Sequence, residues 1–98
     1  MSLNDLRITI IQTEIIWENK QENLRSLRSK LEKLCGETDL VVLPEMFSTG
    51  FSMRSDVLSE SITGMTITTL QQWASEFNLA IAGSYIACEN TYYFNRAF

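Results

Sequence analysis

A short apolar run, Leu40-Val41-Val42-Leu43, leads directly into Pro44-Glu45-Met46-Phe47-Ser48-Thr49-Gly50-Phe51. Four consecutive apolar residues between polar segments are typical of a strand buried on both faces, as in a parallel sheet. Pro44 has no backbone N–H for a sheet ladder and ends the strand. The carboxylate of Glu45 therefore stands just beyond the carboxyl end of a central strand, where open α/β sheets bind their ligands.

The segments on either side predict two helices and three further strands. β-branched residues predict a strand over 6–12, and leucines at helical spacing predict a helix over 20–35. The same periodicity predicts a helix over 65–77, followed by strands over 79–86 and 91–98. The last two strands are too close for a crossover, so they should pair as an antiparallel hairpin. The order β-α-β-α-β-β predicts an α/β fold with a mixed sheet.

The segment 44–63 shows little periodicity, and irregular loops of this length are usually functional. Pro44, Met46 and Phe47 flank Glu45 in the sequence, so we expect dry surroundings for its carboxylate. A carboxyl group in such a place suits the work of a general base. The competing interpretation is an exposed glutamate in the loop that follows a strand.

Composition narrows the possible chemistry. The 98 residues carry a net charge of −4, so the basic surface that binds nucleic acid is missing. No apolar run approaches the roughly 18 residues that span a membrane. The absence of histidine excludes Ser-His-Asp and Cys-His nucleophile systems and histidine-bearing metal sites within this chain. Two cysteines are too few for a four-thiolate zinc site and fit a reducing, cytoplasmic setting. We expect no metal and no cofactor.

Four stretches stand out in order along the chain: Ile8-Thr9-Ile10-Ile11-Gln12 with Trp17, then 43–53, then Ile81-Ala82-Gly83-Ser84, then Tyr92-Tyr93-Phe94-Asn95-Arg96-Ala97. Together they resemble the N-terminal portion of the nitrilase superfamily of carbon–nitrogen hydrolases, and more narrowly its omega-amidase branch. The Pro-Glu motif alone would be a weak signal, but the four occur in order and cover nearly the whole chain.

The resemblance implies a fold and a reaction. Family members use a Glu-Lys-Cys triad in a four-layer α-β-β-α sandwich, usually as dimers, to release ammonia from small linear amides such as ω-amides of 2-oxo dicarboxylic acids. Residues 1–98 would then be the N-terminal portion of one such domain, with Glu45 as general base and Met46 and Phe47 lining a short slot for the acyl chain. The matching lysine and cysteine lie beyond the equivalent of Phe98, so the chain alone should be inactive.

Other interpretations stay open at this stage. The chain could be a non-catalytic α/β module completed by a partner chain at an open sheet edge, instead of part of a homodimeric enzyme. Met46 and Phe47 could pack under the loop, and Arg54 could bind a substrate carboxylate or lie in solvent. Asn95 and Arg96 are expected to hold loops and turns. A flavodoxin-like nucleotide binder is disfavoured, because 13–17 has no glycine-rich phosphate cradle.

Overall fold

A three-stranded parallel sheet forms the centre of the molecule. The computed structural model describes residues 5–50 and 52–98, so Phe51 of the Pro-Glu motif lies outside the described residues. The strand order is β1-β2-β3, which places the predicted apolar strand in the middle. The strands are β1 (Ile8–Ile10), β2 (Leu40–Val42) and β3 (Ala80–Ala82). Val41 at the centre of β2 is fully buried.

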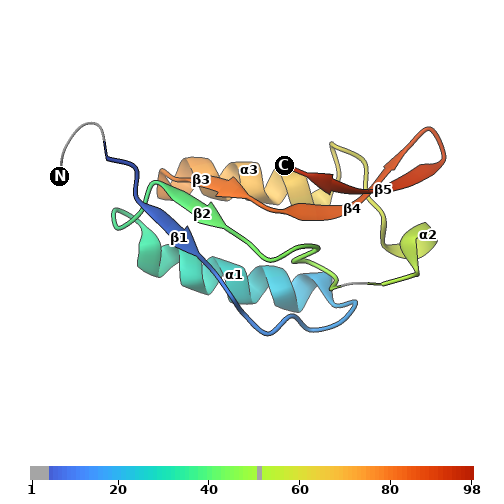
Figure 1. Ribbon diagram of the computed structural model, residues 1–98, viewed down its shortest axis with the longest axis horizontal. Helices are drawn as coiled ribbons and strands as arrows, with labels where there is room; N and C mark the ends of the chain where they lie inside the picture. Colours follow the sequence, from blue (N-terminus) through green and yellow to red (C-terminus); the bar gives the residue numbers. More distant parts are fainter. Residues whose placement is uncertain (1–4, 51) are drawn as a thin grey trace.

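Two helices pack on one face of this sheet and against each other (Figure 1). They are α1 (Lys20–Leu34) and α3 (Met65–Phe77), so the second helix matches its predicted bounds and the first ends one residue early. The Asn19 side chain caps α1 by accepting a hydrogen bond from the Glu22 amide at 3.2 Å, as capping-box spacing predicts. The core between helices and sheet contains Ile11, Leu24, Leu27, Leu31, Val41, Leu43, Phe47, Leu70, Trp73, Phe77 and Leu79.

The side chains on the other face of the parallel sheet are exposed or half-buried. Strand register aligns two rows of apolar side chains across it: Ile8, Leu40 and Ala80, then Ile10, Val42 and Ala82. Ile8 and Ile10 are 53% and 72% exposed. Because parallel sheets are normally buried on both faces, this open face is suited to contact with further polypeptide.

An antiparallel hairpin extends past the end of the parallel sheet (Figure 1). It consists of β4 (Ser84–Glu89) and β5 (Tyr92–Ala97). The two turn residues, Asn90 and Thr91, both have positive φ, as in the tight turns that match the twist of paired strands. The predicted hairpin is therefore confirmed, but its two strands form a separate ladder from that of β1, β2 and β3.

The prediction of one continuous strand over 79–86 was wrong, because Gly83 divides it into β3 and β4. The Gly83 amide donates to the Phe98 carbonyl at 3.4 Å, and the Phe98 amide donates to the Gly83 carbonyl at 3.0 Å. A Cβ on Gly83 would lie only 2.9 Å from Cζ of the Phe98 ring. A glycine is needed where this ring lies against the backbone, and the pairing changes there from parallel to antiparallel.

The long loop over 44–63 is more ordered than its composition predicts. It contains a short helix, α2 (Ser55–Leu58), which the absence of periodicity did not reveal. Beyond it, the Glu60 amide donates to the Ile86 carbonyl at 2.9 Å, and the Cys88 amide donates to the Glu60 carbonyl at 2.8 Å. The loop is thus joined to the free edge of β4 by backbone hydrogen bonds.

Candidate active site

A tight turn follows β2 and fixes the residues on either side of Glu45. Met46 has a left-handed backbone conformation with φ of 49°, which is unusual for a residue with a side chain and is typical of strained functional positions. Its amide donates to Oγ of Ser84 at 2.9 Å. Its carbonyl accepts from the Thr49 and Gly50 amides at 3.2 and 2.8 Å. These bonds compensate the strained conformation and hold the turn against β4.

The Glu45 side chain is exposed, so the expected dry surroundings are not present within the described residues. The apolar neighbours Met46 and Phe47 turn into the protein instead, which leaves the carboxylate on the outer side of the turn. Oε1 of Glu45 accepts a hydrogen bond from Nδ2 of Asn95 on β5. The sequence placed Glu45 at a strand end but gave no indication that Asn95 would be its partner.

An open depression of about 150 Å³ lies beside this pair, and Asn95 is part of its wall. Met46 also lines it, packed with Leu58 and Ile86 in a small buried cluster. Phe47 does not, because it belongs to the main core and meets the ring of Phe98 edge-on at 6.0 Å. Of the two predicted pocket residues, the structure brings only Met46 to this depression. The full lining is Met46, Ser52, Ser55, Ile86, Tyr93, Phe94 and Asn95.

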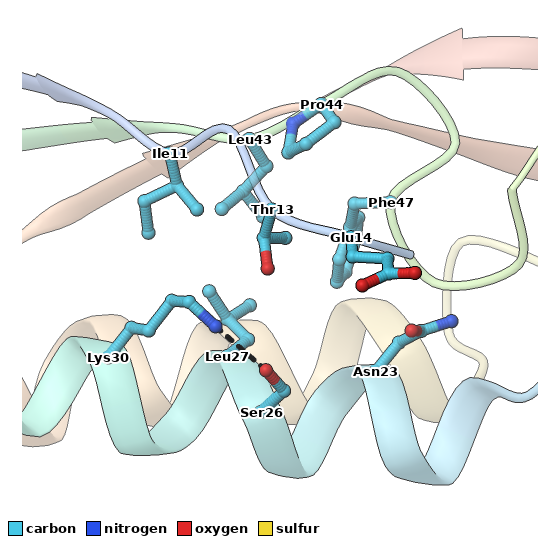
Figure 2. Close-up of a pocket in the computed structure, with 10 residues that line it drawn as sticks. All are labelled: Ile11, Thr13, Glu14, Asn23, Ser26, Leu27, Lys30, Leu43, Pro44 and Phe47. Atoms are coloured by element: carbon cyan, nitrogen blue, oxygen red, sulfur yellow. Dashed lines mark hydrogen bonds between the residues drawn. The ribbon is translucent and has the colours of Figure 1, made fainter. Parts of the chain in front are cut away.

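A second cavity lies on the other side of the turn, between the strand ends and α1 (Figure 2). Its volume of about 20 Å³ is sufficient for about one water molecule. Lys30 Nζ lies 2.8 Å from Oγ of Ser26 along its helical wall. The lining residues are Ile11, Thr13, Glu14, Asn23, Ser26, Leu27, Lys30, Leu43, Pro44 and Phe47. Because this cavity is so small and Asn95, the partner of Glu45, is not in its wall, we assign the candidate site to the depression that Asn95 lines.

Asn23 connects three segments behind the site, and sequence reasoning missed it. Its buried side chain accepts from the Ile16 amide at 2.8 Å and donates to the carbonyls of Ile16 and Ser48 at 2.8 and 2.7 Å. It therefore ties α1 to the loop after β1 and to the turn that carries Glu45. The available signal was a polar residue next to Leu24 at the edge of the leucine stripe.

Arg54 lies at the surface with its side chain 59% exposed, and it also has a protein partner. Its NH1 donates to Oε1 of Glu18 at 2.7 Å, while Oε2 of Glu18 accepts from Oγ of Ser52 at 2.6 Å. The Glu18 side chain is only 9% exposed, so Arg54 neutralises a nearly buried carboxylate. The arrangement holds the loop beside the depression and accounts for Arg54 without a bound ligand.

Glu60 is a further residue that the sequence did not reveal. Its carboxylate accepts from the Thr66 amide at 2.7 Å and from Thr66 Oγ1 at 2.5 Å, and it pairs with Lys20 Nζ at 2.7 Å. Burial works to raise the pKa of Glu60, but the hydrogen bonds from Lys20 and Thr66 outweigh it and lower the pKa below its ordinary value. Glu60 thus joins the first turns of α1 and α3 to the loop that borders the depression.

The remaining candidates for chemistry lie elsewhere. Cys35 is exposed at the end of α1, beside the start of β2, whereas Glu45 follows the end of that strand. Cys88 is half-buried in β4. Within residues 5–50 and 52–98, no three acidic or cysteine side chains come together to form a metal site. In the same part of the chain, no helix combines the length and apolarity that a bilayer crossing needs.

The chain belongs to the carbon-nitrogen hydrolase family, because the family's sequence pattern matches residues 7–98. Two relatives are named omega-amidase YafV. The protein from Yersinia enterocolitica is 34% identical over 84 residues, which are 84% of this chain and 31% of that protein. The protein from Escherichia coli BL21-DE3 is 35% identical over 79 residues, or 81% of this chain and 30% of that protein.

A solved structure shares the same fold. It is XC1258 from Xanthomonas campestris, described as a CN-hydrolase superfamily protein with an arsenic adduct in the active site. The two structures agree with a TM-score of 0.90 at 34% sequence identity, over 97% of this chain and 36% of that one. This chain therefore spans about a third of the length of the proteins it matches. The predicted family and α/β class are confirmed.

Proposed function

We propose that this chain supplies the general base, Glu45, to a carbon–nitrogen hydrolase of the omega-amidase type. The observation that supports this proposal is the position of the Glu45 carboxylate. It follows the carboxyl end of the central parallel strand, on a turn whose left-handed residue Met46 has its amide and carbonyl hydrogen-bonded, beside an open depression. The omega-amidase names of the relatives support the reaction class. The proposed substrates are small linear amides, in particular ω-amides of 2-oxo dicarboxylic acids.

The reaction needs more than a carboxylate. An amide carbon is a poor electrophile, so a cysteine thiolate attacks it and an acyl-enzyme forms as ammonia leaves. Glu45 would take the thiol proton, pass it to the departing nitrogen, and then take a proton from the water that hydrolyses the acyl-enzyme. A lysine ammonium would stabilise the oxyanion of the tetrahedral intermediates. We propose that the lysine and cysteine belong to the two thirds of the family domain that this chain does not span.

The open face of the parallel sheet fits the same proposal. Its rows of apolar side chains, which include the exposed Ile8 and Ile10, match what a second sheet covers in a four-layer α-β-β-α sandwich. We propose that further polypeptide of the family domain covers this face, and that the complete molecule is a homodimer.

Two assays test the proposed function. The 98-residue chain should release no ammonia from the ω-amide of 2-oxoglutarate. A chimera in which residues 7–98 replace the matching segment of E. coli omega-amidase YafV should release it. Glu45→Gln in the chimera should lower kcat by about 10²- to 10⁴-fold, the usual contribution of general acid–base catalysis. Glu22→Gln, an exposed carboxylate paired with Arg25, is the matched control and should leave kcat unchanged. Full activity of the Glu45→Gln chimera would contradict the proposal.

A further inference from the structure

The hydrogen bond between Asn95 and Glu45 joins residues fifty positions apart in the sequence. Asn95 lies opposite Ile86 in the hairpin register. Ile86 packs on Met46, and Ser84 of the same strand accepts from the Met46 amide at 2.9 Å. The turn that carries Glu45 is therefore fixed to β4 through its backbone, and the Glu45 side chain is fixed to β5 through Asn95.

The type of partner matters for the chemistry of Glu45. The amide nitrogen of an asparagine side chain is a hydrogen-bond donor and accepts no proton, so Asn95 orients the carboxylate without competing for its role. Among residues 5–50 and 52–98, the carboxylate has a hydrogen-bond partner at Oε1 and none at Oε2, whose lone pairs can take a proton. Because Glu45 is exposed, its side chain would otherwise sample several rotamers. A reacting group displaced by about 1 Å loses about 10²-fold in rate.

We propose that Asn95 is a positioning residue, which holds one oxygen of Glu45 beside the depression that Asn95 lines and leaves the other oxygen available to take a proton. The role rests on the proposed function of Glu45 as general base. The neighbouring residue, Arg96, points to the other side of β5 and pairs with Glu89 at 2.6 Å. Arg96→Gln is therefore a matched control on the same strand.

The contact itself is tested by NMR on the 98-residue chain, independently of any activity. One Nδ2 proton of Asn95 should resonate downfield of free asparagine amides. It should return toward the ordinary range in Glu45→Gln, because the neutral carbonyl of glutamine is a weaker acceptor than a carboxylate and its NH₂ group is not an acceptor. It should stay in place in Arg96→Gln. An unshifted Asn95 amide in the unmodified chain would overturn the proposal whatever the chimera does.

The role is tested by kinetics in the YafV chimera. Asn95→Ala should lower kcat by about 10- to 100-fold, the equivalent of one hydrogen bond to a charged group, with little change in KM. Asn95→Asp fills the same space but removes the donor and brings a second carboxylate to Glu45, so kcat should fall at least as far. If Asn95 acted only by filling space, this isosteric change would leave kcat unaltered.

The outcomes separate the two proposals. Unchanged kcat in Asn95→Ala, or recovery of kcat in Asn95→Asp, overturns the positioning role while the proposed function of Glu45 stands. An inactive parent chimera contradicts the proposed function and with it the role of Asn95, even where the NMR contact is present. Arg96→Gln should keep the parent kcat, because it leaves the Asn95–Glu45 contact intact.

Discussion

Replacing Glu60 by glutamine tests whether one partly buried ion pair holds the loop beside the candidate site. Glutamine keeps the shape of the side chain and one acceptor for Thr66, but it leaves the Lys20 ammonium without a charged partner. The two side chains are only 11% and 19% exposed, so neither is well hydrated in the folded protein. We therefore expect the change to destabilise the chain rather than to be neutral.

The expected loss is about 2 kcal/mol in the free energy of unfolding. Hydrogen bonds to charged groups contribute about 1.5–3 kcal/mol. Removing one partner of a fully buried pair costs about 3–5 kcal/mol, and the partial exposure of Lys20 places this pair below that range. Two kcal/mol is a large share of the roughly 5–15 kcal/mol that stabilises a small domain.

Urea unfolding followed by tryptophan fluorescence measures this loss as a lower midpoint with an unchanged m-value. Glu22→Gln breaks an exposed pair, with side chains 40% and 75% exposed, and should cost less than about 1 kcal/mol. The double variant Lys20→Met/Glu60→Gln should lose less than the sum of the two single changes. If Glu60→Gln costs no more than Glu22→Gln, burial does not strengthen this pair and the reasoning fails.

The pH dependence of this loss has a defined sign. The folded-state pKa of Glu60 is lowered from its ordinary value of 4.5, so its ionised form stabilises the fold. That contribution is complete above about pH 4.5 and disappears as pH falls through the lower, folded-state pKa. The stability difference between the unmodified chain and Glu60→Gln should therefore be constant near neutral pH and shrink in acid.

Three further changes should alter stability in defined directions. Asn23→Ala leaves the buried Ser48 carbonyl and two part-buried backbone groups of Ile16 without their partner and should cost about 2–4 kcal/mol by urea unfolding. Gly83→Ala places a methyl group against the Phe98 ring and should cost about 1–3 kcal/mol, much of it recovered in Gly83→Ala/Phe98→Leu. Thr91→Gly removes a β-branched residue with φ of 67° next to Asn90, so it should raise Tm; a lower Tm would contradict the turn assignment.

Regular elements were predictable from the sequence because their signals are local. Leucine spacing set the bounds of α1 to within one residue, and the apolar run from Leu40 identified the central strand. The break at Gly83 was not predictable, because it depends on the Phe98 ring, which follows β5 and is distant in the sequence. A local apolar pattern can show that a strand is buried, but it cannot show which neighbour will lie on it.

The candidate site was predictable only in part, for the same reason. The strand end and Pro44 identified the position of Glu45, while its exposure follows from a left-handed turn at Met46 that no residue type signals. Asn95 reaches Glu45 through strand pairing across fifty positions, and the backbone of Glu60 bridges to Ala87 of β4. Such contacts require the register of β4 and β5, which the alternation of side chains alone does not specify.

The junction at Gly83 has a mechanical consequence. One continuous backbone segment, 80–89, belongs to both units: its first part, β3, pairs in the parallel sheet, and its second part, β4, pairs in the hairpin. The Glu45 turn follows β2 in the first unit, and Asn95 belongs to the second. A change in strand twist at Gly83 would rotate the hairpin relative to the parallel sheet. The angle at which Asn95 meets the Glu45 carboxylate would then change. Residues that touch neither side chain can therefore tune the geometry of this pair.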